Sequence, residues 1–142
     1  MKHFGSNFYY EKRRNEELMK AYRKAMHQTA HIRLNEICRT IADMPASRFW
    51  VSEERAAVVV AKMMKGESID YMRPLKRSMF LEIYRRVTEM MRDNPGMPIC
   101  KCCLKVVNSP APKFYMTPLS IRQTIFKIKS GWYNERLKRT SH

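Results

Sequence analysis

The sequence predicts an all-α protein made of two tandem helical repeats, helix-turn-helix-like in outline, each with an extended corner of proline and aromatic residues. Apolar residues recur at helical spacing in every long segment, and prolines or glycines punctuate those segments. In addition, Pro45–Ser52 returns 65 positions later as Pro110–Thr117, and both copies run without a gap to a glycine, Gly66 and Gly131. Comparison of the two copies distinguishes the positions that the unit keeps from those that have diverged.

The first predicted helix runs from Phe8 to about Met26 and carries Leu18 and Tyr22 on its apolar face. A second helix is expected over residues 32–43, where apolar residues follow the i, i+3, i+4, i+7, i+8 spacing of a buried stripe. No glycine or proline separates the two. Residues 8–43 could therefore form one long helix instead of two.

Pro45 ends the second helix, and residues 47–51 are expected to be extended. Ser52 is placed to cap a third helix whose first residues, Glu53 and Glu54, suit the positive end of a helix dipole. That helix is expected to stop at Gly66, the usual C′ position. The apolar stripe of this third helix is Ala56, Val59, Val60, Met63 and Met64.

The second repeat follows the same order, with helices expected near 76–92 and 98–107, then a Pro-Ala-Pro corner. Thr117 and Pro118 read as an N-cap followed by proline at the first helical position. The last helix presents Ile121, Ile125 and Ile128 and ends at Gly131. The expected organisation is an N-terminal repeat (1–66), a linker (67–75), a C-terminal repeat (76–131) and a basic tail (132–142).

The charge of the chain is strongly positive, with 28 lysines and arginines against 13 aspartates and glutamates, a net charge of +15. Such an excess points to a polyanionic partner, because it costs self-repulsion in the free protein. Residues 76–142 hold 14 of the basic and 4 of the acidic residues. The second repeat and the tail are therefore the part expected to face the anion.

Two groups of cations are candidates for contacting phosphates. The larger lies in the last helix and tail, where Arg122 and Lys129 are seven positions apart and share a helix face. The full candidate set is Arg48, Lys113, Arg122, Lys127, Lys129, Arg136, Lys138 and Arg139. The simpler interpretation of a charge run is a solvated surface.

Arg48 and Lys113 are the basic residues of the repeated corner, each followed by two aromatic residues. An exposed cation beside a helix N-terminus could position a phosphate there. Alternatively the corner is a packing unit in which Phe49 and Phe114 are buried anchors. In that case only the basic residues remain open to a nucleic acid.

The cysteines invite a metal hypothesis that their spacing does not support. Cys100, Cys102 and Cys103 form a C-x-C-C pattern, whereas structural zinc sites use paired C-x2-4-C elements or histidine partners. Cys102 and Cys103 also align with Ile37 and Cys38 on the buried stripe of the first repeat. We therefore expect packing rather than metal binding, and no cofactor.

Further expectations come from what the sequence lacks. It contains no glycine-rich phosphate loop and no hydrolase or metalloprotease motif, which argues against an enzyme with a small-molecule substrate. No apolar run approaches the length of a membrane span, and no signal peptide is visible. Crowded free thiols fit the reducing cytoplasm.

The pairing of a short striped helix with a second amphipathic helix resembles the helix-turn-helix class of DNA-binding proteins. The segments concerned are 34–42 into 52–65 and 99–107 into 117–130. The connections, Asp43–Val51 and Asn108–Met116, are longer than the three or four residues usual in that class. The P-A-x-[RK]-F-[WY]-x-[ST] signature also resembles small basic proteins of phages and mobile elements.

These observations together predict a non-enzymatic DNA-binding protein, such as a regulator, a packaging factor or a nucleoid-type protein, with its basic C-terminal half on the phosphates. DNA is favoured over RNA as the partner, self-association is compatible with the sequence, and a membrane is not expected. The alternative is a phage-type structural or assembly protein, or an RNA- or ribosome-binding protein, whose basic surface faces an acidic partner or a packaged genome.

Overall fold

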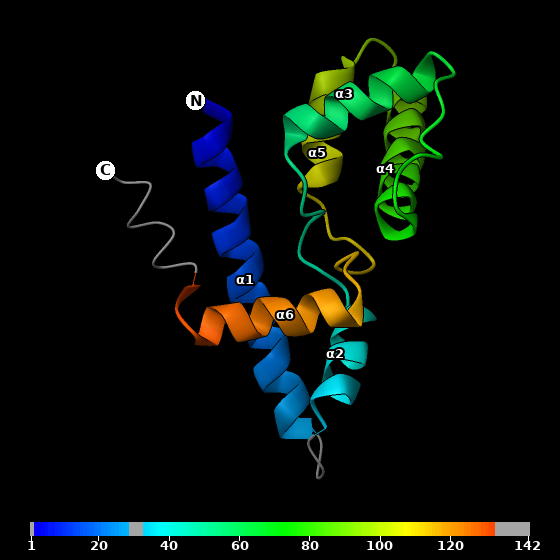
Figure 1. Cartoon of the computed structure of the whole chain (residues 1–142). Coiled ribbons are helices and arrows are strands. Elements are labelled where there is room, and N and C mark those ends of the chain that lie inside the picture. The colour runs from blue at the N-terminus through cyan, green and yellow to red at the C-terminus, as the bar shows by residue number, and fades with distance from the viewer. Residues whose placement is uncertain (1, 29–32, 133–142) are drawn as a thin grey trace.

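The computed structural model describes residues 2–28 and 33–132, and over these residues the chain is all-helical with no strand (Figure 1). The predicted fold class is confirmed at this level. The helices are α1 (Lys2–Gln28), α2 (Leu34–Ala42), α3 (Glu53–Met64), α4 (Pro74–Asp93), α5 (Ile99–Val107) and α6 (Pro118–Lys129).

Residues 8–43 form two helices, which decides the question that the sequence left open. α1 begins earlier than the predicted Phe8 and ends at Gln28, and α2 begins at Leu34. Arg33, the residue before α2, has extended backbone angles, as an N-cap residue does. The chain therefore leaves the helical conformation between the two elements although no glycine or proline marks the place.

The packing of the helices does not follow their order along the chain. α2 packs against α1 and α6, whereas α5 packs against α4 and α3. The third helix of each predicted repeat thus joins the first two helices of the other repeat, as Figure 1 shows for α6 crossing α1 and for α3 lying over α5. We call these groups the α1–α2–α6 lobe and the α3–α4–α5 lobe.

The two lobes are joined where the extended segments 43–52 and 108–117 cross; we call these corner 1 and corner 2. Ala46 and Ala111 exchange two backbone hydrogen bonds, N to O distances of 3.0 and 2.9 Å, as an isolated antiparallel bridge. The amide of Phe49 also donates to the carbonyl of Val107 at 3.0 Å. Because the bridge pairs residues 65 positions apart, each corner meets its own counterpart from the other half of the chain.

The buried stripes of the short helices fall at matching positions in the two halves. Ile37, Cys38 and Ile41 of α2 correspond to Cys102, Cys103 and Val106 of α5, and all six are at most 2% exposed. Likewise α3 buries Ala56, Val59 and Val60, and α6 buries Ile121, Thr124 and Ile125. The prediction that the cysteines of α2 and α5 pack in the core is therefore confirmed for all but the exposed Cys100.

The ends of the third helices also match the sequence prediction. The hydroxyl of Ser52 accepts a hydrogen bond from the amide of Arg55, and that of Thr117 accepts one from Ser120, each at 3.0 Å. Gly66 and Gly131 follow the helices with φ of +88° and +78°. Glycine adopts this left-handed conformation without a steric penalty, which is why a glycine closes each helix.

The consecutive helices of the expected helix-turn-helix pairs do not pack against each other. α2 has no packing contact with α3, and α5 has none with α6, in the described part of the chain. A helix-turn-helix arrangement stays a prediction, and it would have to combine helices from different repeats. In the residues described, no helix is long and apolar enough to span a membrane.

Candidate nucleic-acid interface

α6 is the most one-sidedly basic helix at the surface of the α1–α2–α6 lobe. Its sequence contains Arg122, Lys127 and Lys129 and no acidic residue. The helix forms because Thr117 caps it and Pro118 presets its first backbone angle, and it is held by a buried stripe against α2 and α1. All three cations are exposed, as the interpretation of this helix as an anion-facing element requires.

The cations of α6 are held in place by neighbours rather than neutralised by carboxylates. Arg122 donates from Nη1 to Oδ1 of Asn35 at 2.9 Å, and Lys129 donates from Nζ to the hydroxyl of Tyr22 at 3.0 Å. The ammonium of Lys129 also lies 4.5 Å from the Tyr22 ring centroid, and that of Lys127 lies 4.9 Å from the ring of Trp132. These contacts fix positions, and among the described residues none of the three cations has an ion-pair partner.

Arg122 is brought together with two arginines that the sequence argument did not select. Arg33 and Arg39, from the start and the end of α2, line one surface cleft of about 370 Å³ with Arg122. Asn35 and Glu36 also line it, so the described residues bring three guanidinium groups and one carboxylate to the cleft. Three arginines around one hollow suit a phosphate, because each guanidinium can donate two parallel hydrogen bonds to its oxygens.

No local signal in the sequence identifies Arg33 and Arg39 as partners of Arg122. They stand nearly 90 positions away, and they meet α6 only because α6 packs on α2 of the other repeat. The prediction that residues 76–142 face the anion therefore included Arg122 of this cleft but not Arg33 and Arg39. Arg136, Lys138 and Arg139 lie outside the described residues.

Arg48 is buried, which corrects the expectation that it is an exposed cation. Its residue is 4% exposed, and its guanidinium donates to the carbonyls of Phe49 and Val51 and to Oδ1 of Asn108, at 3.0, 2.8 and 3.2 Å. Nearly all of its surface is covered because corner 1 folds around the side chain and the ring of Tyr10 in α1 lies over the guanidinium, with its centroid 4.4 Å from Cζ. Arg48 therefore ties corner 1 to corner 2 and has little surface left to offer a phosphate.

Lys113, the counterpart of Arg48 in corner 2, is only half-buried. Its ammonium lies 5.6 Å from the ring centroid of Tyr115. Tyr115 in turn stacks on Phe49 of corner 1 with centroids 6.0 Å apart. Phe49 and Phe114 are 0% and 3% exposed, so the prediction that these phenylalanines are core anchors is confirmed.

The buried cysteines Cys38 and Cys103 are packing residues whose thiols are held protonated. Within the described residues, no three His, Cys, Asp or Glu side chains gather as metal ligands would. Burial raises the pKa of the Cys103 thiol to about 11 and also raises the pKa of Cys38. Thiols held protonated in this way behave as small apolar side chains.

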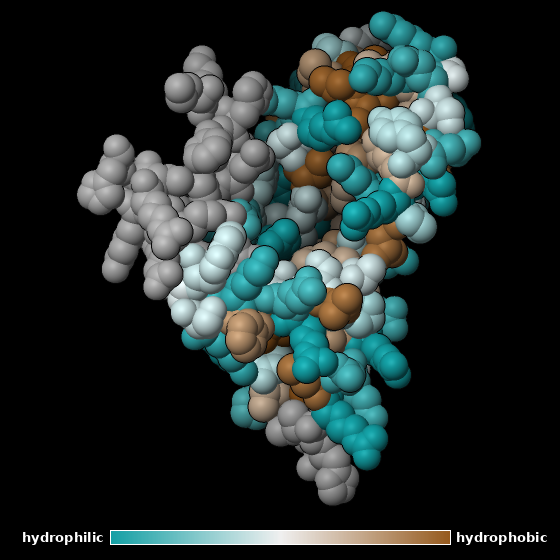
Figure 2. All heavy atoms as spheres, in the orientation of Figure 1, coloured by the Kyte–Doolittle hydropathy of each residue, from teal (hydrophilic) through white to brown (hydrophobic). Residues whose placement is uncertain are grey.

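The outer side of α6 combines its cations with two exposed apolar residues. Leu119 and Phe126 are 63% and 73% exposed, and they are seven positions apart, so they share the face that carries Arg122 and Lys127. Hydrophilic residues cover most of the side of the molecule seen in Figure 2, with isolated hydrophobic residues where α6 crosses it. This face is the part of the helix that solvent or a partner meets.

Comparison of the chain with protein-family models, with curated proteins and with solved structures gives no match.

Proposed function

We propose that this chain is a non-enzymatic nucleic-acid-binding protein that contacts the phosphates of duplex DNA with the surface of α6 and α2. The observation that carries the proposal is the cleft lined by Arg33, Arg39 and Arg122 next to a helix without acidic residues. Phosphate contacts supply most of the affinity of such proteins, and arginine is the side chain best suited to them.

The proposal includes a duplicated architecture, in which the two halves are copies of one unit that have exchanged their third helices. Three features support it: the corners pair at the sequence offset of the repeat, the buried positions of α2 and α5 correspond, and those of α3 and α6 correspond. An exchange of this kind places residues of both copies on each lobe. The phosphate surface would then depend on the two halves folding together.

The experiment is a titration of fluorescently labelled duplex DNA, single-stranded DNA and RNA by fluorescence anisotropy, at salt concentrations from about 50 to about 300 mM. About five phosphate contacts predict a slope near −4.5 for log affinity against log salt on duplex DNA. Arg122→Glu and Lys127→Glu should each lower the affinity roughly tenfold and make that slope shallower by about 1.

Lys62→Glu is the matched control, because Lys62 occupies in α3 the position that Lys127 occupies in α6, and both are exposed. This variant should leave the affinity for duplex DNA nearly unchanged. Equal losses in the Lys62 and Lys127 variants would mean that net charge, rather than the α6 surface, drives binding. Tighter binding to RNA than to DNA would reassign the partner.

A second candidate function, assembly with copies of itself or with another protein, is favoured by the exposed Leu119 and Phe126. Large apolar side chains on an outer helix face often mark protein contacts. Light scattering after size-exclusion chromatography separates the two functions. A large closed assembly that Phe126→Glu dissolves would support the assembly role, and a monomer that binds DNA would support the first proposal.

A further inference from the structure

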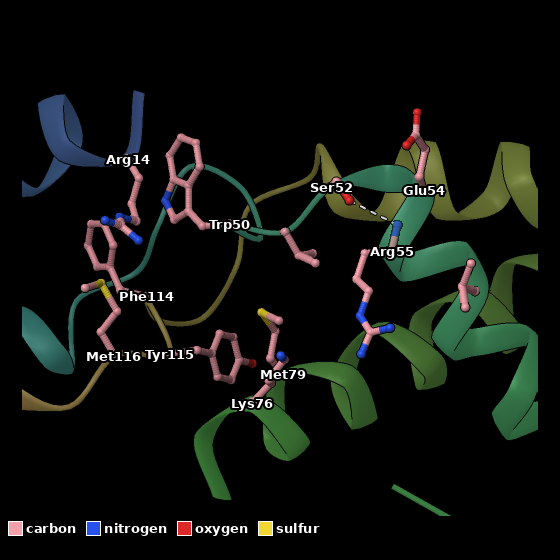
Figure 3. Close-up of a pocket in the computed structure, with 12 residues that line it drawn as sticks. Arg14, Trp50, Ser52, Glu54, Arg55, Lys76, Met79, Phe114, Tyr115 and Met116 are labelled. Carbon is pink, nitrogen blue, oxygen red and sulfur yellow. Dashed lines mark hydrogen bonds between the residues drawn. The ribbon is translucent and has the colours of Figure 1, made fainter. Parts of the chain in front are cut away.

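A larger cleft lies between the two lobes, on residues that the proposed DNA surface does not use. Its volume is about 660 Å³, within the range of roughly 300–1,000 Å³ typical of small-ligand sites. Residues of α1, α3, α4 and both corners line it (Figure 3). A cleft of this size accepts a single extended strand or a small molecule, and it is too small for a duplex.

The walls of this cleft carry an excess of positive charge. Arg14 comes from α1, Arg55 from α3 and Lys76 from α4, and among the described residues Glu54 is the one carboxylate that lines the cleft with them. Within the described residues, the side chains of Arg55 and Lys76 have no ion-pair or hydrogen-bond partner. Two uncompensated cations on facing helices favour a ligand with more than one negative charge.

One end of the cleft also has a hydrogen-bond donor without an acceptor. The indole Nε1 of Trp50 is buried and has no hydrogen-bond partner among the described residues, which is uncommon for a buried polar atom. The guanidinium groups of Arg48 and Arg13 lie 5.3 and 6.0 Å from the centroid of the indole ring, so two further positive charges flank this end of the cleft. In Figure 3 the indole nitrogen points toward the end of the cleft where Arg14 lies.

The floor of the cleft is apolar and aromatic. Phe114, Tyr115 and Met79 line it, and Val58 beside them is 47% exposed. Tyr115 is held there in a left-handed backbone conformation, φ of 59°, which a residue other than glycine adopts only when its surroundings fix it. A cation-lined groove with an aromatic floor is the arrangement that proteins use for single nucleic-acid strands.

We propose that the cleft between the lobes binds a short single-stranded nucleic-acid segment of a few nucleotides. Arg14, Arg55 and Lys76 contact its phosphates, and the floor at Tyr115 and the exposed Val58 receives its bases. Because these residues are separate from Arg33, Arg39 and Arg122, the inference does not rest on the duplex-binding proposal. The molecule then has two nucleic-acid sites of different kinds.

The test uses Trp50 as its reporter, since the chain has 2 tryptophans and Trp132→Phe leaves Trp50 alone. Full-length protein with this change is titrated with a short oligothymidylate, with a duplex of equal length, with a polyglutamate peptide and with inorganic phosphate. Oligothymidylate should change the emission of Trp50, and the other three probes should bind at least tenfold more weakly at this site.

Arg55→Ala combined with Lys76→Ala should weaken oligothymidylate binding at least tenfold, and both residues are exposed, so the fold should survive. Lys62→Ala, also on α3 but outside the cleft, is the matched control and should change the affinity less than twofold. Arg122→Glu should weaken duplex binding and leave the signal from Trp50 unchanged. Failure of one site is thereby distinguished from failure of the other.

Three outcomes overturn the inference. They are equal binding by the double-alanine variant, tighter binding of polyglutamate than of oligothymidylate, and full competition by the duplex at this site. The second outcome would identify an acidic peptide as the occupant, and the third would merge the cleft with the duplex surface.

Discussion

α3 and α6 hold equivalent places in the two lobes, yet they present different surfaces. Both begin at a hydroxyl cap, bury residues at the same three relative positions and end before a glycine. Outside, α3 starts with Glu53 and Glu54, whereas α6 has Pro118 and Leu119 at those positions and no acid at all. The two helices thus bury the same relative positions and differ on their exposed sides, so we place the function on the surfaces that differ.

The largest test of this comparison concerns the anchors of the two corners. Phe49→Ala should lower the free energy of unfolding by about 4 kcal/mol and Phe114→Ala by about 3 kcal/mol, because each substitution empties a buried site. Phe49 is the more costly because it is fully buried, lies under Arg86 at 5.0 Å and stacks on Tyr115. Urea denaturation followed by circular dichroism measures both values.

The Phe114 variant carries a second readout, because Phe114 also borders the cleft between the lobes. If Phe114→Ala left the stability unchanged and removed binding to nucleic acid, its role as a core anchor would be wrong.

A second test compares how the buried Cys103 and the exposed Cys100 of α5 affect stability at alkaline pH. Burial raises the pKa of Cys103 to about 11 from an ordinary value of 9.0, so the folded protein keeps a proton that the unfolded chain loses. Stability should therefore be full below pH 9 and fall by about 2 kcal/mol as the pH rises to about 11.

Lysines and tyrosines also titrate at alkaline pH, so the control is to compare the loss of stability in each variant with the loss in the native chain. Contributions common to all of the proteins cancel in that comparison. Cys103→Ala should show a smaller alkaline loss than the native chain, and Cys100→Ala, at an exposed position, should keep most of the loss, because burial rather than the neighbouring Cys100 is the largest cause of the raised pKa of Cys103. Identical alkaline profiles for all three proteins would contradict the assignment to Cys103.

The sequence was sufficient to predict the elements of this fold but not their partners. The apolar spacing of α2 and α5, the caps at Ser52 and Thr117 and the terminal glycines are local signals, and each was confirmed. An apolar stripe such as that of α6 indicates that one side of the helix is buried, but it does not indicate which helix packs against that side. The packing of α3 on α4 and α5, and of α6 on α1 and α2, was therefore not predictable from periodicity, although the long corners were compatible with it.

The same limit explains the candidate site. Arg122, Lys127 and Lys129 could be selected because helix spacing and local charge are visible along the chain. Arg33 and Arg39 could not, because they join Arg122 only through the packing of α2 on α6. Arg48 was misjudged for the opposite reason: its charge is visible in the sequence, but the carbonyls that enclose it belong to a folded corner.

A third test concerns the hydrogen bonds that join α1 to corner 1 and α4 to corner 2. Glu17 of α1 accepts hydrogen bonds from the amide and hydroxyl of Ser47 at 2.6 and 2.7 Å. Pro112 replaces Ser47 in corner 2 and has no amide hydrogen, and there Arg86 of α4 donates to the carbonyl of Pro110 at 2.8 Å instead. The two corners are therefore held by side chains of opposite charge.

Arg86→Ala should lower stability by about 1.5 kcal/mol, since the charged hydrogen bond to corner 2 is lost and Glu82 loses one of its two arginine partners. Lys24→Ala, at an exposed position of α1, should have almost no effect. Thermal denaturation of the two variants measures the contrast, and equal melting temperatures would show that the Pro110 contact contributes nothing.

The smallest expected effect is the loss of a helix N-cap, and comparing stability with DNA affinity separates the structural role of the cap from the function of its helix. Ser52→Ala and Thr117→Ala should each cost about 1 kcal/mol, because each leaves one amide of the first turn without its acceptor. If α6 rather than α3 carries the phosphate contacts, only Thr117→Ala should also weaken duplex binding, through fraying of the turn that precedes Arg122. Anisotropy measured well below both melting temperatures checks this, and weakened binding in the Ser52 variant as well would mean that both third helices face the DNA.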